Sequence, residues 1–528
     1  MATKSNSIHH VDPEKLDLSN KAEPSNNEVC PRAQSASGWT DSPQLVPTIE
    51  YTPAEERALI WKQDLTIIPL SAYIYFLCFF DRSNIGNAKV LNSSTKNDMQ
   101  TEIHATAYQF NIALMIFLVG MSWQPLPPSR PYAVVTRLTP LGYAIFEVPS
   151  NILLKKLRPS RWLAFLMFSW GAITIGLGGV TSFAATTGVR FLLGVFEAGL
   201  FPGLVYYLTF WYKTDERSVR VAFILASATL AGAFGGAIAY AIGHMNGARG
   251  LSAWRWLFII EGIPSCLSAL LVWFFLPDYP EEHLKGRHRE IALARLRVEG
   301  SKSHDRSMTK QDAINTLKDW RLYGHYAIYF GVGVPFSSLS LFAPSITAGL
   351  GFTDLRAQLM TVPPYAVAYV TQILVSWSAD HFNARGLHTA VFALVGAIGF
   401  MASALLPADA YTPRYGCFIV AAAGAFACIP PMLGWLTSNV YSTAAVGLAV
   451  AINVSFGAGI GQMPGVWIYK ADEAKIGYPT GHWVNAGMLF FVSVGATGLR
   501  LYYGWRNKKL LREVEERGRG EEVRLFRL

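Results

Sequence analysis

Apolar segments of about twenty residues recur along most of the chain, and this repetition limits the fold more than any other feature. A helix needs roughly 20 apolar residues to cross the hydrocarbon core of a bilayer. Of the 528 residues, 51% are hydrophobic and only 15% are charged, whereas soluble domains average about 25% charged residues. The sequence therefore predicts an all-α, multi-pass membrane protein and not a soluble enzyme.

The apolar segments fall into two groups of six, separated by a longer polar stretch. Two related six-helix halves with a site between them near the midplane are a common plan of secondary transporters. We predict twelve transmembrane helices, at about 64–86, 105–155, 161–180, 184–212, 218–245, 254–276, 322–349, 358–380, 387–406, 414–437, 443–469 and 483–505.

This pattern divides the chain into five parts. Long loops and tails that are rich in polar residues cannot bury a core, so the N-terminal part is expected to be disordered. The parts are a cytoplasmic tail (1–60), a first six-helix half (61–276), a cytoplasmic central loop (277–320), a second six-helix half (321–505) and a second cytoplasmic tail (506–528).

Positive charge is concentrated between the apolar segments. The net charge of +9 would suit a nucleic-acid partner, but the basic runs, such as 155–158 and 506–509, flank predicted helices. Cytoplasmic loops of membrane proteins carry such an excess of Lys and Arg. We therefore expect both termini in the cytoplasm, a location in the plasma membrane, the lipid bilayer as surroundings and no nucleic-acid partner.

Residues 121–142 interrupt the second predicted helix with several prolines and two arginines. Proline removes a backbone donor and clashes inside a helix, and unpaired backbone groups are not tolerated in lipid. Removing Met121 through Gly142 would join the flanking residues into one uninterrupted apolar helix. We interpret the segment as an aberrant insertion, from a retained intron or a gene-model error. The alternative is a genuine extra loop that breaks the helix.

Charged side chains inside the predicted helices are candidates for function, because each costs at least about 2.5 kcal/mol at the bilayer centre. Arg190 and Glu197 are seven residues apart, so two helical turns place them on one face of the fourth helix. A network between the first and fourth helices is therefore expected. The charged residues at membrane depth are Asp81, Arg82, Glu147, Arg190, Glu197 and Glu261.

We assign these charges to separate tasks. Arg82, with Arg190 beside it, is the candidate for the substrate carboxylate, because a guanidinium binds a carboxylate bidentately and stays charged. Glu197 is the candidate proton carrier and Asp81 the second, since burial raises a carboxyl pKa and a nearby arginine lowers it. The alternative is a structural salt-bridge network. Glu147 and Glu261 are interpreted as structural tethers.

Three further positions lie outside this network. Tyr329 in the seventh helix and Asn453 in the eleventh are candidates for the opposite wall of a substrate cavity, with simple packing as the alternative. Asn92 begins the sequence Asn-Ser-Ser in a predicted outer loop, which matches a glycosylation sequon.

Several motifs resemble the anion:cation symporter branch of the major facilitator superfamily, in particular its fungal allantoate-permease-like group. They are DRSNIGNA (81–88), FEVPSN (146–151), RFLLGVFEAGLFPG (190–203) and WRWLFIIEG (254–262). The resemblance covers about residues 60–505. It implies the major facilitator fold, a proton-coupled symport mechanism, and coupling acids at positions that match Asp81 and Glu197.

A further pair of residues enters through the same resemblance. Asp380 with Arg385 is similar to the gating-loop motif of the superfamily, and the pair is therefore expected to act as a cytoplasmic gate latch.

The leading hypothesis is thus a proton-coupled, monomeric symporter of a small organic anion that works by alternating access. A metabolite exporter or antiporter of a biosynthetic pathway and a receptor that binds without transport are the alternatives. Enzyme activity is not expected, because the sequence contains no nucleophile–base constellation and no phosphate-binding loop. The five cysteines show no metal-ligand spacing, and no cofactor is expected.

Overall fold

Helix is the only regular secondary structure in the part of the chain that the computed structural model describes. This part comprises residues 51–122, 150, 153–154, 156–298, 310–352, 354–440, 443–517 and 525–528. The predicted all-α membrane fold is therefore confirmed. The predicted aberrant insertion at 121–142 lies mostly outside the described residues. Only its first two residues, Met121 and Ser122, are described, at the end of a helix.

The helices of the first half and the central loop begin where the sequence supplies starting signals. Thr52 caps α1 with a capping box, in which Glu55 N donates to Thr52 Oγ1 and Thr52 N donates to Glu55 Oε2. These helices are α1 (Pro53–Val90), α2 (Met99–Glu102), α3 (Ala107–Ser122), α5 (Pro159–Leu177), α6 (Phe183–Ala198), α7 (Leu200–Leu208), α8 (Thr214–Gly243), α9 (Ala253–Phe275), α10 (Pro280–His283), α11 (Arg287–Val298) and α12 (Lys310–Lys318), with short 3₁₀ turns η1 (Ser93–Thr95) and η2 (Ala248–Gly250).

The second half contains the remaining helices, one of which is interrupted by a π-helical segment, η3. A π segment inside a helix often marks a functional site. The elements are α13 (Trp320–Gly349), α14 (Asp354–Leu359), α15 (Val362–His381), α16 (Arg385–Leu405), α17 (Tyr411–Ala427), α18 (Ile429–Asn439), α19 (Thr443–Val454), η3 (Ser455–Ile460), α20 (Met463–Trp467), the 3₁₀ turn η4 (Ala471–Ile476) and α21 (Pro479–Arg517).

Ten helical stretches of the described residues are long and apolar enough to cross a membrane. The other two predicted spans appear differently. The second is represented by the shorter apolar stretch Ala107–Leu118 of α3. The eleventh is divided into α19, η3 and α20, because the π segment shifts the hydrogen-bond register. The structure therefore supports the helical fold, while the count of twelve stays a prediction.

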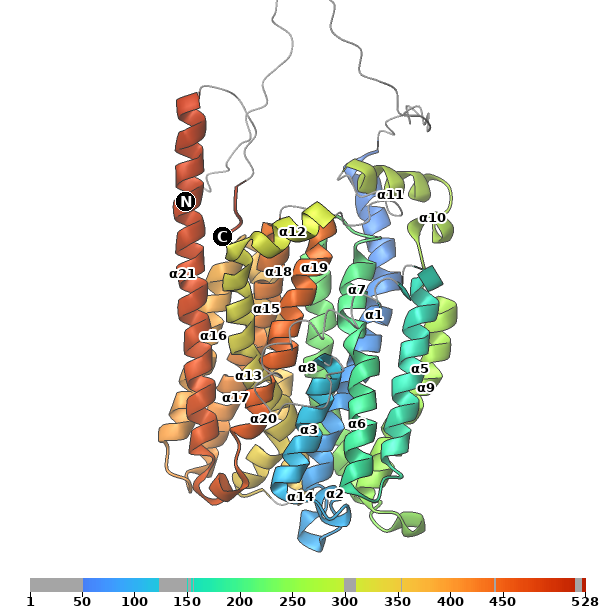
Figure 1. Ribbon diagram of the computed structural model, residues 1–528, viewed down its shortest axis with the longest axis vertical. Helices are drawn as coiled ribbons and strands as arrows, with labels where there is room; N and C mark the ends of the chain where they lie inside the picture. The colour runs from blue at the N-terminus through green and yellow to red at the C-terminus, as the bar shows by residue number, and fades with distance from the viewer. Residues whose placement is uncertain are drawn as a thin grey trace, which may run out of the picture. The chain divides into compact units, whose positions relative to one another are not determined.

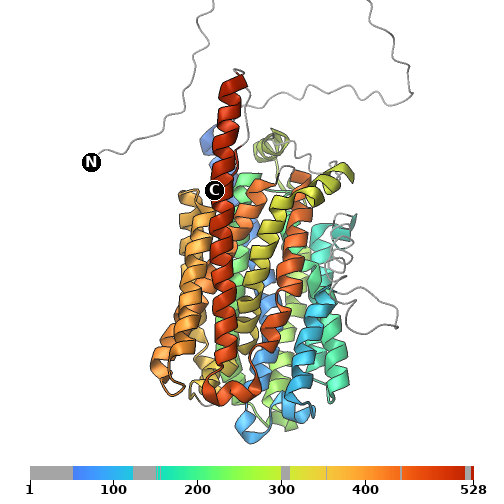
Figure 2. The same cartoon turned by 60° about the vertical axis from the view of Figure 1, so that its left-hand side comes forward.

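The helices of residues 53–275 form one group, beside a second group formed by those of residues 320–517 (Figure 1). In the first group α5 packs on α9, and α3 packs on α6. In the second group α16 packs on both α17 and α21, and α21 extends beyond its neighbours (Figure 2). Side chains of both groups meet between them, where α1 contacts α13 and α8 contacts α15.

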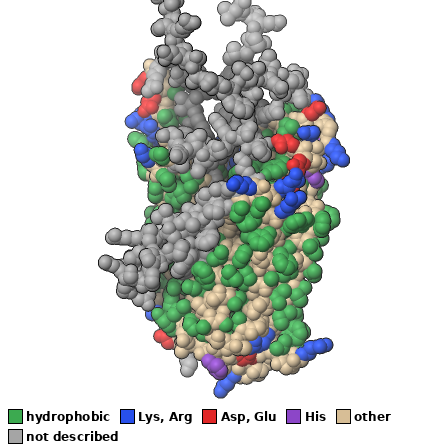
Figure 3. Space-filling model, turned by 45° about the vertical axis from the view of Figure 1, so that its right-hand side comes forward, with side chains coloured by type: hydrophobic (Ala, Val, Ile, Leu, Met, Phe, Trp, Pro, Cys, Tyr) green, Lys and Arg blue, Asp and Glu red, His purple; other side chains and the backbone are tan. Residues whose placement is uncertain are grey.

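The outer surface of the bundle is apolar between two polar ends. Hydrophobic side chains cover the middle of the face in Figure 3, and the visible Lys, Arg, Asp and Glu side chains lie toward the ends. Large apolar side chains of the bundle, such as Leu267, Phe274 and Trp377, are exposed. Such a surface would be unfavourable in water, because burying apolar area is what drives folding there, and it suits contact with lipid.

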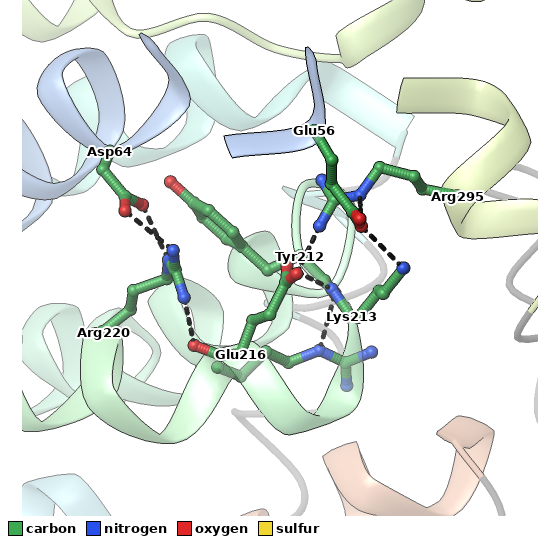
Figure 4. A network of polar contacts seen from close by, with 8 residues as sticks. Glu56, Asp64, Tyr212, Lys213, Glu216, Arg220 and Arg295 are labelled. Carbon is green, nitrogen blue, oxygen red and sulfur yellow. Dashed lines mark hydrogen bonds and ion pairs between the residues drawn. The ribbon is translucent and has the colours of Figure 1, made fainter. Parts of the chain in front are cut away.

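We call the end that carries α10, α11 and α12 the basic end (Figure 1). Ion pairs there join α11 to α1 and α8 of the first group (Figure 4). Glu56 of α1 accepts hydrogen bonds from Arg295 of α11 at 2.7 Å and from Lys213 at 2.9 Å. Asp64 of α1 accepts two hydrogen bonds of 2.7 Å from Arg220 of α8. Arg295 also pairs with Glu216 of α8, so α11 is fixed to the ends of both α1 and α8.

Close helix packing in the second group depends on glycine. A Cβ on Gly424 of α17 would lie 2.3 Å from the backbone nitrogen of Gly396 in α16, whereas a Cβ on Gly416, also in α17, would meet nothing within 4 Å. Small residues at helix interfaces allow backbones to approach closely in membranes. The two glycines therefore offer a matched test of this packing.

Gly424→Ala is expected to lower the thermal unfolding midpoint of the purified protein, and Gly416→Ala is expected to leave it unchanged or raise it. Overpacking a tight contact costs about 1–3 kcal/mol, and replacing an unhindered helical glycine by alanine gains up to about 1 kcal/mol. The measurement is a melting curve of each variant in the same detergent. Equal midpoints for the two variants would contradict the packing described here.

Candidate functional site

A cavity of about 50 Å³ lies between the two groups of helices. Helices of both groups form its wall, so it occupies the position in which an alternating-access transporter holds its substrate. Its lining residues are Tyr75, Cys78, Phe79 and Arg82 of α1, Glu197 of α6, Leu200 and Phe201 of α7, Leu225 of α8, Tyr329, Val332, Gly333 and Phe336 of α13, Ile429 of α18, Val454 of α19, Gly457 of η3, and Gln462.

Arg82 and Glu197 form an ion pair on the wall of this cavity. The distance from Arg82 Nε to Glu197 Oε2 is 3.3 Å, and the two side chains are 8% and 0% exposed. The Cys78 thiol lies 3.5 Å from the same carboxylate oxygen. The guanidinium lies over the rings of Phe79, at 4.7 Å, and Phe117, at 5.1 Å. The pair is thus held in an apolar frame, where charges attract more strongly than in water.

Asp81 lies on another side of α1 from its neighbour Arg82, because successive residues on a helix diverge by about 100°. Its Oδ2 atom accepts a hydrogen bond of 2.6 Å from Ser265 of α9. Glu261, one turn earlier in α9, is also buried, and neither of its carboxylate oxygens has a hydrogen-bond partner among the described residues. Neither acid lines the cavity.

Arg190 is buried in the first group and does not line the cavity either. Its guanidinium lies 5.8 Å from the Phe117 ring and 5.9 Å from the Phe258 ring. Within the described part of the chain, its Nε and Nη2 atoms have no hydrogen-bond partner. In this conformation Arg190 therefore does not contact the space that the ion pair of Arg82 and Glu197 faces, although the sequence placed it beside Arg82.

Of the two candidates in the second group, only Tyr329 lines the cavity. A Cβ on Gly457 of η3 would lie 1.8 Å from the Tyr329 ring, so glycine is required where this ring is seated. Asn453 is buried outside the cavity wall. The sequence did not predict Tyr75 or Gln462 as site residues. The cluster of glycines in and after η3 could have indicated Gln462, because these glycines mark where the backbone comes close to α13.

The remaining predicted positions that the structure describes do not line the cavity. Arg385 donates to Asp380 at 2.6 Å and also contacts Gly434 O and the Ser438 hydroxyl, so the turn between α15 and α16 is tied to α18. Glu147 lies outside the described residues. Asn92 is 8% exposed, and its amide nitrogen donates to Gly243 O at 3.2 Å. Its glycosylation stays a prediction.

The two groups contact each other on more than one level around the cavity. Thr229 of α8 donates to the Gln372 side chain of α15 at 2.8 Å, and Gln358 of α14 donates to Asn87 O of α1 at 3.2 Å. The cavity holds about 50 Å³, about a third of the roughly 150 Å³ that accommodates a benzene molecule in a protein interior. The cavity is thus too small for a benzene-sized solute, and binding one requires the wall to widen.

Residues 72–466 match the family model described as Major Facilitator Superfamily. The chain belongs to the major facilitator superfamily. It is 68% identical over 473 residues to MFS transporter prlL of a fungal species (strain NRRL 50135), an alignment that covers 89% of this chain and 90% of that one. This facilitator is therefore a multi-pass membrane transporter, as predicted.

This facilitator is also similar to a more distant relative and to a solved transporter structure. It is 31% identical over 354 residues to a putative tartrate transporter of Agrobacterium vitis, covering 65% of this chain and 72% of that one. The solved structure of the xylose transporter XylE from E. coli, partially occluded and inward open, matches with a TM-score of 0.56 at 16% identity, covering 82% of this chain and 97% of XylE. At that identity the likeness to XylE concerns the fold alone.

Proposed function

We propose that this facilitator carries a small organic anion together with a proton, as a member of the anion:cation symporter branch. The ion pair of Arg82 and Glu197 on the cavity wall is the observation that carries the proposal. Arg82 is the one Lys or Arg among the described residues that line the cavity. A guanidinium suits a carboxylate, since its planar fork offers two parallel hydrogen bonds.

The ion pair also provides a reason for coupling. With Glu197 ionised, Arg82 already has a carboxylate partner, and an arriving anion would add a second negative charge beside one positive charge. A buried uncompensated charge is strongly unfavourable. When Glu197 takes up a proton, Arg82 is released from it and can bind the substrate carboxylate. Proton and anion are therefore bound together and released together.

Asp81 is the proposed second proton-binding group. The described residues of α1, α6 and α9 bury three acids (Asp81, Glu197, Glu261) and two arginines (Arg82, Arg190). One more acid than arginine in an apolar interior favours at least one protonated carboxyl, because burial disfavours the charged form. Asp81 lies between α1 and α9, away from the cavity, so it stores a proton without contacting substrate.

The direction of insertion follows from the distribution of charge. We propose that the basic end faces the cytoplasm of a plasma membrane, since cytoplasmic loops are enriched in Lys and Arg. Asp380 and Arg385 then belong to the closing contacts of the second group, in keeping with the gate-latch hypothesis. Opening toward either side requires the contacts between the two groups to separate in turn.

The proposal is tested with the purified full-length protein in proteoliposomes. Uptake of a labelled carboxylate panel is measured with and without an inward proton gradient, and we expect accumulation only with the gradient. Equilibration that ignores the gradient would contradict coupling, and binding without flux would indicate a receptor. Lower accumulation in cells that express the protein would instead indicate export.

A further inference from the structure

The charged side chains of the cavity wall lie on one side only, and this asymmetry restricts the substrate. Arg82 and Glu197 project from the first group, whereas the described lining residues of the second group are uncharged and mostly apolar, with Val332, Phe336 and Ile429 among them. We propose that the transported anion is a monocarboxylate attached to an apolar, ring-containing body, and that hydroxylated and multiply charged acids are rejected. This inference rests on the proposed function, because it assumes that Arg82 binds the carboxylate.

The number of charges on the wall limits the substrate to one carboxylate. Arg82 is the one cationic side chain among the described lining residues. Lys89 lies two turns further along α1, where its ammonium group lies over the rings of Phe110, at 5.6 Å, and Phe342, at 5.2 Å. Neither Lys89 nor Arg190 reaches the cavity wall in this structure. A second carboxylate would therefore be desolvated without a partner, which is unfavourable in an apolar site.

The apolar part of the wall disfavours hydroxyl-rich acids. Leu200, Phe201 and Leu225 of the first group continue the apolar surface that the second group presents. Polar atoms away from the ion pair come from Tyr75, Tyr329 and Gln462. A hydroxyl-rich acid would lose its hydrogen bonds to water and would find few hydrogen-bond partners on the wall. Hydroxyls that are left unpaired oppose binding. An apolar body gains from the same wall because its surface leaves water.

Aromatic side chains meet across the boundary between the two groups. The rings of Phe79 in α1 and Phe336 in α13 are 5.5 Å apart and edge to face. Tyr75 packs on Phe79 at 5.1 Å and on Phe201 at 5.2 Å. When the groups separate, a substrate ring can take the place of one partner in the Phe79–Phe336 contact, since aromatic rings favour this arrangement. The Arg82 guanidinium lies 4.7 Å from the centre of the same Phe79 ring. The binding positions for the substrate's carboxylate and for its ring are therefore adjacent.

The test measures binding to the purified full-length protein, because lipophilic acids cross bilayers unaided and would obscure flux. Acetate, benzoate and 2-naphthoate form a series with one charge and a growing apolar body, with tartrate and neutral 2-naphthalenemethanol as comparisons. We expect the dissociation constant to fall by about tenfold or more for the added ring, since each buried methylene gives roughly a fourfold gain. Tartrate and the neutral alcohol are expected to bind more weakly than 2-naphthoate.

Two substitutions at Phe336 test whether the preference for a ring-containing acid depends on the apolar part of the cavity wall. Phe336→Ala should reduce the gain from benzoate to 2-naphthoate, and Phe336→Leu, which keeps an apolar side chain of similar bulk, should retain most of it. Phe274→Ala is the matched control, because Phe274 is 75% exposed on the outer face of α9. Each variant is first checked for a monodisperse profile and a cooperative melting transition.

The outcomes separate the substrate class from the proposed function. Tighter binding of tartrate than of 2-naphthoate, lost in Arg82→Ala, would overturn the inference and leave organic-anion transport intact. A ring preference unchanged by Phe336→Ala in a folded protein would also overturn it. Failure of every carboxylate to bind, or carboxylate binding that is unaffected in Arg82→Ala, would contradict the proposed function itself.

Discussion

Arg82→Ala is expected to abolish anion transport by a protein that still folds and reaches the membrane. Truncating one partner of a buried, hydrogen-bonded charge pair costs about 2–5 kcal/mol, which corresponds to roughly a 30-fold to several-thousand-fold loss of affinity. The fold should survive, because Glu197 can take up a proton once its partner at 3.3 Å is removed. Transport of a labelled carboxylate into proteoliposomes measures the effect.

Two controls distinguish a binding role of Arg82 from a structural one. Arg82→Lys keeps the positive charge but loses the planar fork, so we expect weakened transport rather than none. Arg161→Ala removes an exposed arginine near the start of α5 and should leave transport unchanged. The Arg82→Ala, Glu197→Gln double variant leaves no buried charge from the pair. It should match the wild-type melting temperature more closely while remaining inactive, and normal transport by Arg82→Ala would refute the assignment.

The second large effect is expected for Glu197→Gln, which should lose proton-driven accumulation while still binding and exchanging substrate. The amide resembles the carboxyl in shape but cannot gain or lose a proton in the working pH range. In the wild type, one proton carried with one monovalent anion allows about tenfold accumulation for each pH unit of gradient. In the variant the internal concentration should only reach the external one, whereas exchange of labelled for unlabelled substrate continues.

Glu290→Gln is the matched control for this experiment, because Glu290 is an exposed acid of α11 outside the membrane-spanning helices. It should show wild-type accumulation. Full accumulation by Glu197→Gln would instead mean that another group carries the proton. Asp81→Asn would then be the next variant to measure, since Asp81 is buried and hydrogen-bonded to Ser265 across the α1–α9 interface.

The fold was accessible from the sequence because the bilayer imposes a length and a polarity on every span. Segments such as 64–86 and 387–406 therefore coincide with parts of α1 and α16. The eleventh span was not anticipated as broken, because the π segment at Ser455–Ile460 arises where Gly457 accommodates the Tyr329 ring of another helix. A contact between distant segments leaves little trace in local apolar content.

Part of the candidate site could also be predicted from the sequence. Charges at membrane depth stand out in any sequence, so Arg82 and Glu197 were identified, and their separate helices were expected to meet. Which charges face the cavity was not decided by type or spacing. Arg190 shares a face of α6 with Glu197 by spacing, yet it is enclosed by the rings of Phe117 and Phe258.

Residue types alone were enough to predict that this protein lies in a membrane, that it is helical and that a few charges are buried in it, because transfer of charge and apolar surface between water and lipid depends mainly on residue type. The three-dimensional arrangement was needed to show that Arg82 and Glu197 pair on a cavity wall, that Asp81 turns toward Ser265, and that the opposite wall is uncharged and mostly apolar. Those properties depend on the rotation and approach of helices that are far apart in the chain, which are set by packing between them.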